Sequence, residues 1–200
     1  MDRLSTLIAA AAALVGCNPR TDPAGEPPAP TRTDTAKVKP AQTASTDAFC
    51  DVHASDASGD VFHWPELAPG GSAPAGAGAT GWQWVNVWAT WCKPCIAEMP
   101  RITAQRDKLV AAGKRVALTF VSTDDSDAEV AEFRKAHPEL PRSVRIAGNN
   151  QRLAWLRSLH LSDGAIPINL FVSPAGRLRC GRAGEIRDQD LALVDKLLAE

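Results

Sequence analysis

The feature that most constrains the fold is a pair of cysteines, Cys92 and Cys95, placed between an apolar run and a helical pattern. The run from Trp82 to Trp88 is rich in aromatic and β-branched residues, which is typical of a buried strand. From Cys95 to Val110, apolar residues recur at helical spacing. The cysteines therefore lie at a strand-to-helix turn, and cysteines spaced two residues apart can cycle between dithiol and disulfide.

A helix N-terminus favours the thiolate form of a nearby cysteine, because its unpaired N–H groups carry about half a positive charge. Cys92 is nearest that end, so we expect it to be the nucleophile, with a pKa lowered from the free value of about 8.5. Cys95, one turn into the helix, is then the resolving thiol. Lys93 adds positive charge, and Pro94 is compatible with a first helical turn.

Metal and cofactor sites fit this pattern less well. The common zinc sites need a second ligand pair, and the sequence has no second Cys-x-x-Cys and no His-x-x-x-His. Attachment of a c-type haem needs a histidine after the second cysteine, and residue 96 is isoleucine. A glycine motif at Gly76, Gly78 and Gly81 precedes a strand rather than following one, so it does not predict a dinucleotide site. We expect no metal, and no cofactor other than the cysteine pair.

The segment from Val85 to Pro100, in which Trp-Cys-Lys-Pro-Cys is followed by Glu-Met-Pro, resembles the active-site stretch of thioredoxin-like proteins. More narrowly, it is similar to the membrane-tethered bacterial thiol-disulfide reductases of the TlpA/ResA type. The resemblance extends over roughly residues 49 to 200. It implies an α/β thioredoxin-like fold, with a central mixed β-sheet flanked by helices and an N-terminal β-hairpin extension.

The resemblance also assigns roles to single residues. In thioredoxin a buried aspartate commonly occupies the position of Asn86, and the resemblance suggests Glu98 as the replacement acid. It implies a cis peptide bond at Pro167, with the backbone of Ile166 free to pair with an extended substrate strand. Trp91 and Pro167 would flank the reactive sulfur.

Periodicity and turn signals predict alternating strands and helices over the rest of the domain, which favours βαβ units and a mostly parallel sheet. The active-site helix is expected to end at Gly113, and Ser126 with Glu129 forms a capping box for the next helix. A turn signal at 56–60 predicts the N-terminal hairpin. The other expected elements are strands at 114–122, 142–147, 167–172 and 177–182, and helices at 151–160 and 188–199.

The first 48 residues are predicted to lie outside the folded domain. Residues 1–17 read as a signal segment whose end, Leu-Val-Gly-Cys17, resembles a lipobox, in which Cys17 is lipidated and becomes the new N-terminus. An ordinary cleaved signal is the alternative. Residues 18–48 are rich in proline, threonine and alanine, and we expect a disordered tether. The domain at 49–200 would then be periplasmic and anchored to a bacterial membrane.

Two cysteines, Cys50 and Cys180, remain after Cys17 and the redox pair are assigned. In an oxidising exported compartment leftover thiols tend to pair, so we expect a structural disulfide between them. A formal net charge of −1 argues against nucleic acid as a partner.

The predicted function is that of an exported thiol-disulfide reductase acting on disulfides of extracytoplasmic proteins. An exported reductase needs electrons, so a membrane thiol-reducing donor is implied, and we expect a monomer. The resemblance suggests cytochrome c maturation as one context. The same residues could instead serve a dithiol oxidase, and a non-enzymatic thioredoxin-like binding module is the third alternative.

Overall fold

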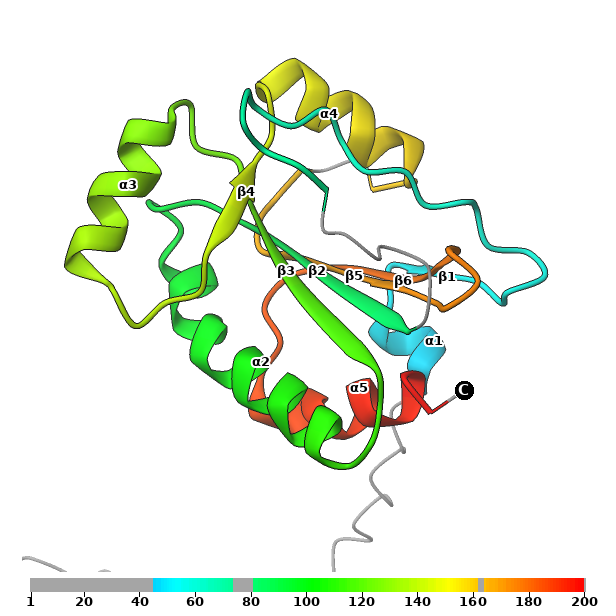
Figure 1. Ribbon diagram of the computed structural model, residues 1–200. Coiled ribbons are helices and arrows are strands. Elements are labelled where there is room, and N and C mark those ends of the chain that lie inside the picture. Colours follow the sequence, from blue (N-terminus) through cyan, green and yellow to red (C-terminus); the bar gives the residue numbers. More distant parts are fainter. Residues whose placement is uncertain (1–44, 74–80, 162–163, 200) are drawn as a thin grey trace, which may run out of the picture. The chain divides into compact units, whose positions relative to one another are not determined.

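The computed structural model describes residues 45–73, 81–161 and 164–199 (Figure 1). Six strands in these residues form one mixed sheet, in the order β1-β6-β5-β2-β3-β4. Strand β2 is parallel to β3, which is parallel to β4, whereas β5 is antiparallel to both β2 and β6, and β6 to β1. The strands are β1 (Val52–His53), β2 (Trp82–Trp88), β3 (Val116–Ser122), β4 (Ser143–Arg145), β5 (Ile168–Val172) and β6 (Leu178–Ala183).

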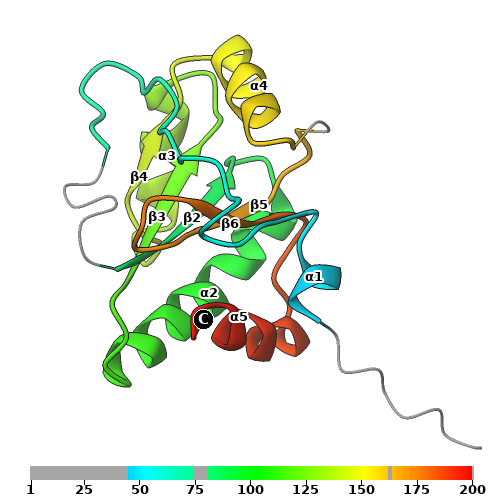
Figure 2. The same ribbon diagram turned by 90° about the vertical axis from the view of Figure 1, so that its right-hand side faces the viewer.

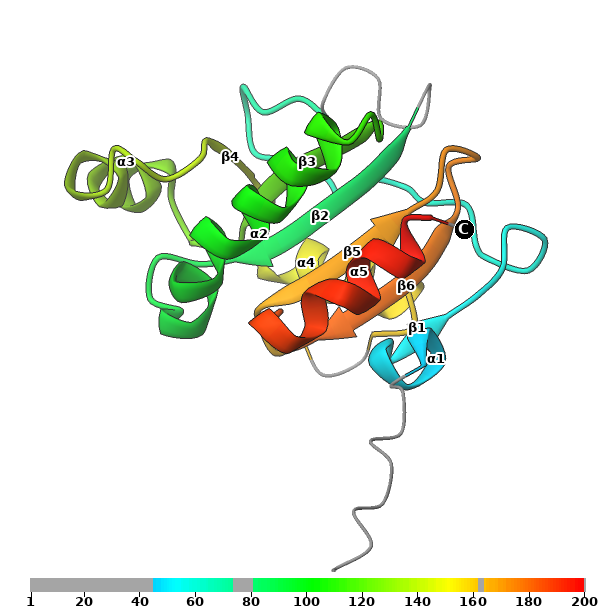
Figure 3. The same cartoon turned by 90° about the horizontal axis from the view of Figure 1, so that it is seen from below.

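Helices cover both faces of this sheet. Helices α2 (Lys93–Ala111) and α5 (Leu191–Leu197) lie side by side on one face, and α4 (Asn149–Ser158) lies on the other (Figures 2 and 3). Helix α3 (Asp127–Ala136) flanks the β4 edge (Figure 1). A short helix, α1 (Thr46–Phe49), precedes β1, and a single 3₁₀ turn, η1 (Asp188–Asp190), precedes α5.

Strand β2 is central because both of its faces are buried. Successive side chains of a strand point to opposite faces, and every residue of β2 is buried. Trp84 and Trp88 pack in the cluster that contains Met99 and Ile102 of α2. Val85 and Val87 pack in the cluster that contains Trp155 and Leu156 of α4. This double burial fixes β2 in the middle of the sheet, and its last residue leads directly into the cysteine turn.

The predicted fold class is confirmed: a mixed sheet flanked by helices. Helix α2 ends close to the expected glycine, and Gly113 has φ 83°, the left-handed conformation that glycine adopts without strain. The expected capping box of Ser126 and Glu129 is present at the start of α3. The expectation of a mostly parallel sheet was wrong, because β5 and β6 form an antiparallel hairpin that makes one half of the sheet antiparallel.

The N-terminal segment pairs differently from the hairpin that we expected. Its two halves do not pair with one another: β1 pairs with β6, and Val61 forms a bridge with Arg177 just before β6. The predicted turn is present between them, closed by the N–H of Gly59 on the carbonyl of Ser55 at 2.7 Å. A Cβ at Gly59 would lie 2.5 Å from the carbonyl oxygen of Leu178, so this close approach requires glycine. A turn signal locates a turn but does not select the strand that its arms pair with.

Helix α1 was not expected, because four residues are too few for a periodic pattern. It begins at Thr46, within the last residues of the predicted tether, and both Thr46 and Phe49 are buried. The side chain of Ser45 caps it by accepting the N–H of Ala48. Most of the predicted tether and the whole predicted signal segment, Cys17 included, lie outside the described residues.

Candidate active site

The two cysteines of the motif form a disulfide at the start of α2. Cys92 is the N-cap residue, and its sulfur accepts the backbone N–H of Cys95 at 3.3 Å. The sulfur of Cys92 thus lies at the positive end of a 19-residue helix, where a thiolate is favoured after reduction. Cys92 is 4% exposed and Cys95 is fully buried, so an approaching sulfur reaches Cys92 first.

The Cys92 sulfur lies near the backbone of Ile166, and an exposed tryptophan directly precedes Cys92 in the chain. Trp91 is 68% exposed, the largest exposed fraction among the bulky hydrophobic residues that the structure describes. The carbonyl oxygen of Ile166 lies 3.8 Å from the Cys92 sulfur, and the peptide bond between Ile166 and Pro167 is cis. The structure therefore brings Trp91, Ile166 and Pro167 to the redox cysteines from two separate parts of the chain.

A groove of about 520 Å³ adjoins this position. Ile166 lines it, together with Gly184 just after β6, and Asp51 and His160 contribute polar groups. His160 contacts the carboxylate of Asp60 at 3.1 Å.

Asp124 anchors the turn that precedes Cys92, a role that no sequence motif indicated. Its carboxylate, which is almost completely buried, accepts the backbone N–H of Thr90 at 3.1 Å and the Thr90 hydroxyl at 2.7 Å. It also accepts the hydroxyl of Ser122, the last residue of β3, at 2.7 Å. The turn is thereby fixed to the neighbouring strand.

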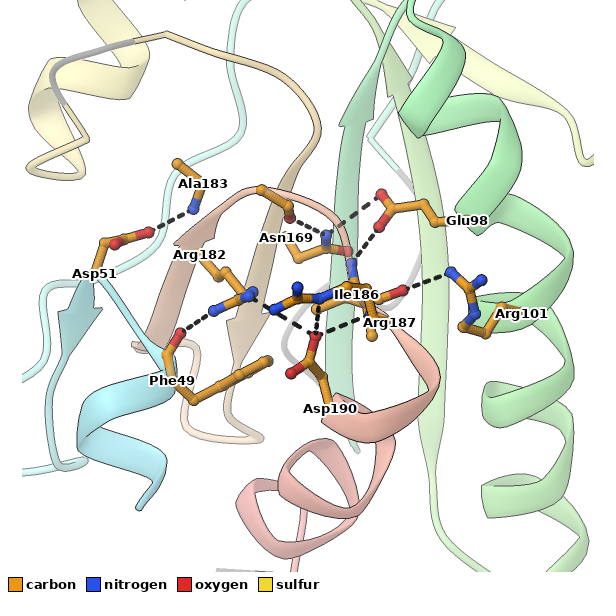
Figure 4. A network of polar contacts seen from close by, with 11 residues as sticks. Phe49, Asp51, Glu98, Arg101, Asn169, Arg182, Ala183, Ile186, Arg187 and Asp190 are labelled. Atoms are coloured by element: carbon orange, nitrogen blue, oxygen red, sulfur yellow. Dashed lines mark hydrogen bonds and ion pairs between the residues drawn. The ribbon is translucent and has the colours of Figure 1, made fainter. Parts of the chain in front are cut away.

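Glu98, on the next turn of α2 after Cys95, is fully buried. One carboxylate oxygen accepts the side-chain N–H groups of Asn86 at 2.7 Å and Asn169 at 3.4 Å. The other oxygen accepts the backbone N–H of Ile186 at 2.6 Å. Figure 4 shows Glu98 with Asn169 and Ile186, in a polar network that joins α2 to β5 and the loop after β6.

Burial raises the pKa of Glu98 from the ordinary 4.5 to about 7. The hydrogen bonds from Ile186, Asn86 and Asn169 act in the opposite direction, because they stabilise the ionised form. The negative charge of Glu185 adds to the increase. A carboxyl group with a pKa near neutrality can both accept and release a proton at physiological pH.

Cys50 and Cys180 form a second disulfide, which joins the end of α1 to β6. Both residues are buried. Within the described residues, no group of three or more histidine, cysteine or acidic side chains is arranged to hold a metal ion. Likewise, none of the helices in the described ranges is long and apolar enough to cross a membrane.

Sequence comparison finds one short similarity, and no family model matches the chain. Over 49 residues the chain is 39% identical to the thioredoxin-like protein YneN of Bacillus subtilis. This match covers 24% of the chain and 29% of the length of YneN.

Structural similarity is more extensive. A secreted thiol-disulfide isomerase from Corynebacterium glutamicum superposes with a TM-score of 0.59 and 17% identity, over 74% of this chain and 92% of that one. A thioredoxin-related protein from Neisseria meningitidis gives a TM-score of 0.53 and 22% identity, over 68% and 98% of the two chains. A protein from Chlorobium tepidum described as a thiol:disulfide interchange protein, DsbE, gives a TM-score of 0.53 and 17% identity, over 70% and 94%. Nearly the whole of each of these folds is therefore present, and the chain is a protein of the thioredoxin-like fold.

Proposed function

We propose that this protein is an exported thiol-disulfide oxidoreductase that reduces disulfides of extracytoplasmic proteins through Cys92 and Cys95. One observation carries the proposal: a disulfide at the N-terminus of α2 whose outer cysteine directly follows an exposed tryptophan and has its sulfur 3.8 Å from a backbone carbonyl. Structural disulfides have no need of an exposed apolar neighbour, whereas a redox disulfide must be reached by a second protein. The thiol-disulfide proteins among the structural neighbours are consistent with this chemistry.

The reaction starts from the dithiol. The Cys92 thiolate attacks one sulfur of the target disulfide, which forms a mixed disulfide and releases the first target thiolate. The Cys95 thiolate then attacks the Cys92 sulfur and releases the second. Two electrons pass to the target, which takes up two protons, and the Cys92–Cys95 disulfide is the product left on the enzyme.

Glu98 is the proposed proton acceptor for this sequence. It lies three residues after Cys95 on the same helix, and Cys95 must lose its proton before it can attack. With a pKa of about 7, Glu98 can take that proton near neutral pH and return it in the next cycle. We call Glu98 a proton-transfer residue of the reductase on this basis.

Target proteins dock, on this proposal, along Trp91, Ile166 and Pro167. An extended segment of the target pairs with the backbone of Ile166, and the side chain beside the target cysteine enters the 520 Å³ groove. The exposed ring of Trp91 packs against the other flank of that segment.

The cellular setting is part of the proposal. The signal segment with Cys17 supports export and a lipid anchor, and the tether at 18–48 supports a domain that reaches partners away from the membrane. A membrane thiol-reducing protein would supply electrons, and apocytochrome c is one candidate target. One of the structural neighbours is described as secreted, which is consistent with an extracytoplasmic site of action. We propose that the protein acts as a monomer.

The reduction potential of the Cys92–Cys95 pair in the full-length protein tests the direction of electron flow. After equilibration with glutathione buffers and thiol trapping, a value near that of thioredoxin, about −270 mV, supports a reductase. A value near that of DsbA, about −120 mV, would make the protein a dithiol oxidase instead. A pair that does not titrate reversibly would leave a binding module as the remaining function.

A further inference from the structure

Two asparagines face each other across the strands beside Glu98. Asn86 of β2 and Asn169 of β5 are direct partners in the antiparallel register, and both are fully buried. Each side-chain amide has a donor and an acceptor end, which exchange places when the group rotates by half a turn. The atoms that face Glu98 therefore depend on what fixes the two amides.

Trp84 fixes the first of them. Its indole nitrogen lies 2.8 Å from Oδ1 of Asn169, and an indole N–H can only donate. Asn169 must therefore turn its oxygen toward Trp84. A contact from Nδ2 of Asn169 to the carbonyl of Gly184 favours the same orientation, but at 3.4 Å it is longer than an ordinary N–H···O bond and holds the amide more weakly.

The second amide follows from the first. The same Oδ1 of Asn169 accepts Nδ2 of Asn86 at 3.1 Å, so Asn86 must present its NH₂ group on this side. That NH₂ group is the one that donates to Glu98 at 2.7 Å. Oδ1 of Asn169 thus accepts from both Trp84 and Asn86, and the NH₂ group of Asn86 donates to both Asn169 and Glu98. The orientation of Asn169 is set by Trp84, and that of Asn86 by Asn169.

The carboxyl group of Glu98 consequently meets only donors. Asn86 and Asn169 donate to one oxygen and the backbone of Ile186 donates to the other. An ionised carboxylate can accept all of these bonds, whereas a protonated one needs an acceptor for its O–H. The nearby acceptor, Oδ1 of Asn86, is buried and has no hydrogen-bond partner among the described residues. In this orientation Oδ1 of Asn86 points away from the carboxyl group of Glu98.

We propose that Trp84 is a positioning residue for Glu98: through Asn169 and Asn86, its indole N–H aims amide donors at the carboxyl group and holds the acceptor away. Replacing the indole N–H frees both amides to rotate. Asn86 can then offer Oδ1 to a protonated Glu98 while accepting from Nδ2 of Asn169. The protonated form gains a hydrogen bond that it lacks in the native arrangement.

The charged groups on the elements around Glu98 are separate from the amide chain. Glu185, in the loop after β6, acts on Glu98 through its negative charge. Arg101 of α2 pairs with Asp188 at 2.7 Å. Asp190 of η1 pairs with Arg182 and Arg187 (Figure 4). The substitution Trp84→Phe leaves every one of these groups in place, so a change in the titration of Glu98 reports on the amide chain.

The test is the titration of the Glu98 carboxyl carbon, followed by ¹³C NMR in the full-length oxidised protein. Trp84→Phe should raise the midpoint by about one pH unit. Hydrogen bonds donated to the ionised carboxylate lower its pKa, and in the variant the rotated Asn86 amide instead accepts a hydrogen bond from the protonated carboxyl group. Trp155→Phe is the matched control, since it removes a tryptophan donor bonded at 2.8 Å to the carbonyl of His63 and should leave the midpoint unchanged. An unchanged midpoint in folded Trp84→Phe overturns the proposal.

A measurement on the wild-type protein covers the case in which Trp84→Phe does not fold. The side-chain NH₂ signal of Asn86 should shift with the same midpoint as Glu98, while the Trp84 indole proton stays protected from exchange throughout the titration. Rapid exchange of that proton, or an Asn86 signal that ignores the titration, contradicts the proposal.

The importance of Trp84 for the reaction rests on the proposed role of Glu98. The titration of Glu98, however, tests the effect of Trp84 whether or not Glu98 has that role. The titration uses the oxidised protein and needs no turnover. If Glu98→Gln keeps full reductase activity, the proposed role of Glu98 fails while Trp84 still orients it. If Glu98→Gln loses activity and Trp84→Phe titrates like the wild type, only the inference about Trp84 fails.

Discussion

The two disulfides of this domain are alike in backbone geometry and opposite in setting. Their Cα atoms are 5.3 and 5.4 Å apart. Cys92 and Cys95 are three residues apart, whereas 130 residues separate Cys50 from Cys180. One closes a single helical turn and the other joins two ends of the domain.

The surroundings differ as much as the loop lengths. Cys92 is at a helix N-terminus, with an exposed tryptophan beside it and a buried acid three residues beyond its partner. The Cys50–Cys180 bond lies at the sheet edge between further links: Arg182 donates to the carbonyl of Phe49 at 2.8 Å, and Asp51 accepts the N–H of Ala183 at 2.7 Å (Figure 4). The reactivity of Cys92 therefore comes from the positive helix terminus and from its accessibility to a partner protein. The stabilising effect of the Cys50–Cys180 bond comes from the length of the loop that it closes.

The largest expected effect separates the two bonds by activity. Cys92→Ser should reduce disulfide reductase activity to background, because Cys95, the thiol that remains in the pair, is fully buried and cannot reach a target disulfide. Cys95→Ser should trap the target on Cys92 as a mixed disulfide, since the resolving thiol is missing. Turnover in a disulfide-reduction assay and non-reducing gels measure these outcomes.

Cys50→Ser is the control for this pair of variants and should keep the activity of its folded fraction. Reductase activity in Cys92→Ser, or its loss in folded Cys50→Ser, would reverse the assignment of the two disulfides.

The second expected effect separates them by stability. Loss of the Cys50–Cys180 bond should lower the free energy of unfolding by up to about 5 kcal/mol, because it closes a loop of 130 residues in the unfolded chain. By the same relation, loss of the short Cys92–Cys95 ring costs about 2 kcal/mol. Urea unfolding of Cys50→Ser and of the Cys92→Ser, Cys95→Ser double variant tests the order.

Cys180→Ser provides an internal check on this measurement. The Cys50→Ser, Cys180→Ser double variant should be about as stable as either single variant, because the bond is lost only once. Additive losses would mean that the two sulfurs stabilise the domain separately.

The third expected effect is a pH dependence that belongs to the redox site. The folded-state pKa of Glu98, about 7, lies above the unfolded value of 4.5, so between these values the folded protein binds the proton and the unfolded chain does not. The contribution of Glu98 is therefore fully present below pH 4.5 and is lost as pH rises through 7. The loss amounts to about 3 kcal/mol, at about 1.4 kcal/mol per pKa unit.

Glu98→Gln removes the titrating group and retains its shape. The stability of the wild type relative to Glu98→Gln should fall between pH 4.5 and pH 7, as measured by urea unfolding at a series of pH values. A constant difference between the two proteins over this range would show that Glu98 titrates normally.

The sequence predicted most of the fold because the signals were local. The strand at Trp82–Trp88, the helix that follows it and the capping box at Ser126 each depend on residues close in sequence. The roles expected for Pro167 and Glu98 came from a resemblance, and the structure places Pro167 beside Cys92 and buries Glu98. These site roles stay predictions until the variants are measured.

The missed features depend on register, which local patterns do not contain. Asn86 and Asn169 each lie in a segment that was predicted as a strand, but only the pairing of β2 with β5 brings them together. The alternation of side chains along β2 places Asn86 on the same face as Trp84, which was the one available signal. The hairpin expected for the N-terminal segment was wrong for the same reason, since its arms pair with a strand more than 110 residues away.

The smallest expected effect concerns Asp124, which ties the redox turn to the end of β3. Asp124→Asn keeps the shape of the side chain but places an NH₂ group against donors, from Thr90 or from Ser122. We expect a stability loss of about 1–2 kcal/mol, the usual cost of leaving a buried donor unsatisfied. Amide hydrogen exchange should also become faster at Thr90, whose N–H bonds to this carboxylate.

Thr90→Val is the graded control, because it removes one hydroxyl bond to Asp124 and keeps the backbone N–H in place. Its stability loss should be smaller than that of Asp124→Asn, and exchange at residue 90 should change little. Neither variant should alter amide exchange around Cys50 and Cys180, since that region is stabilised by its own disulfide and by the pairing of β1 with β6. Equal acceleration at both disulfides would mean that Asp124 stabilises the whole domain, and the redox turn would then have no anchor of its own.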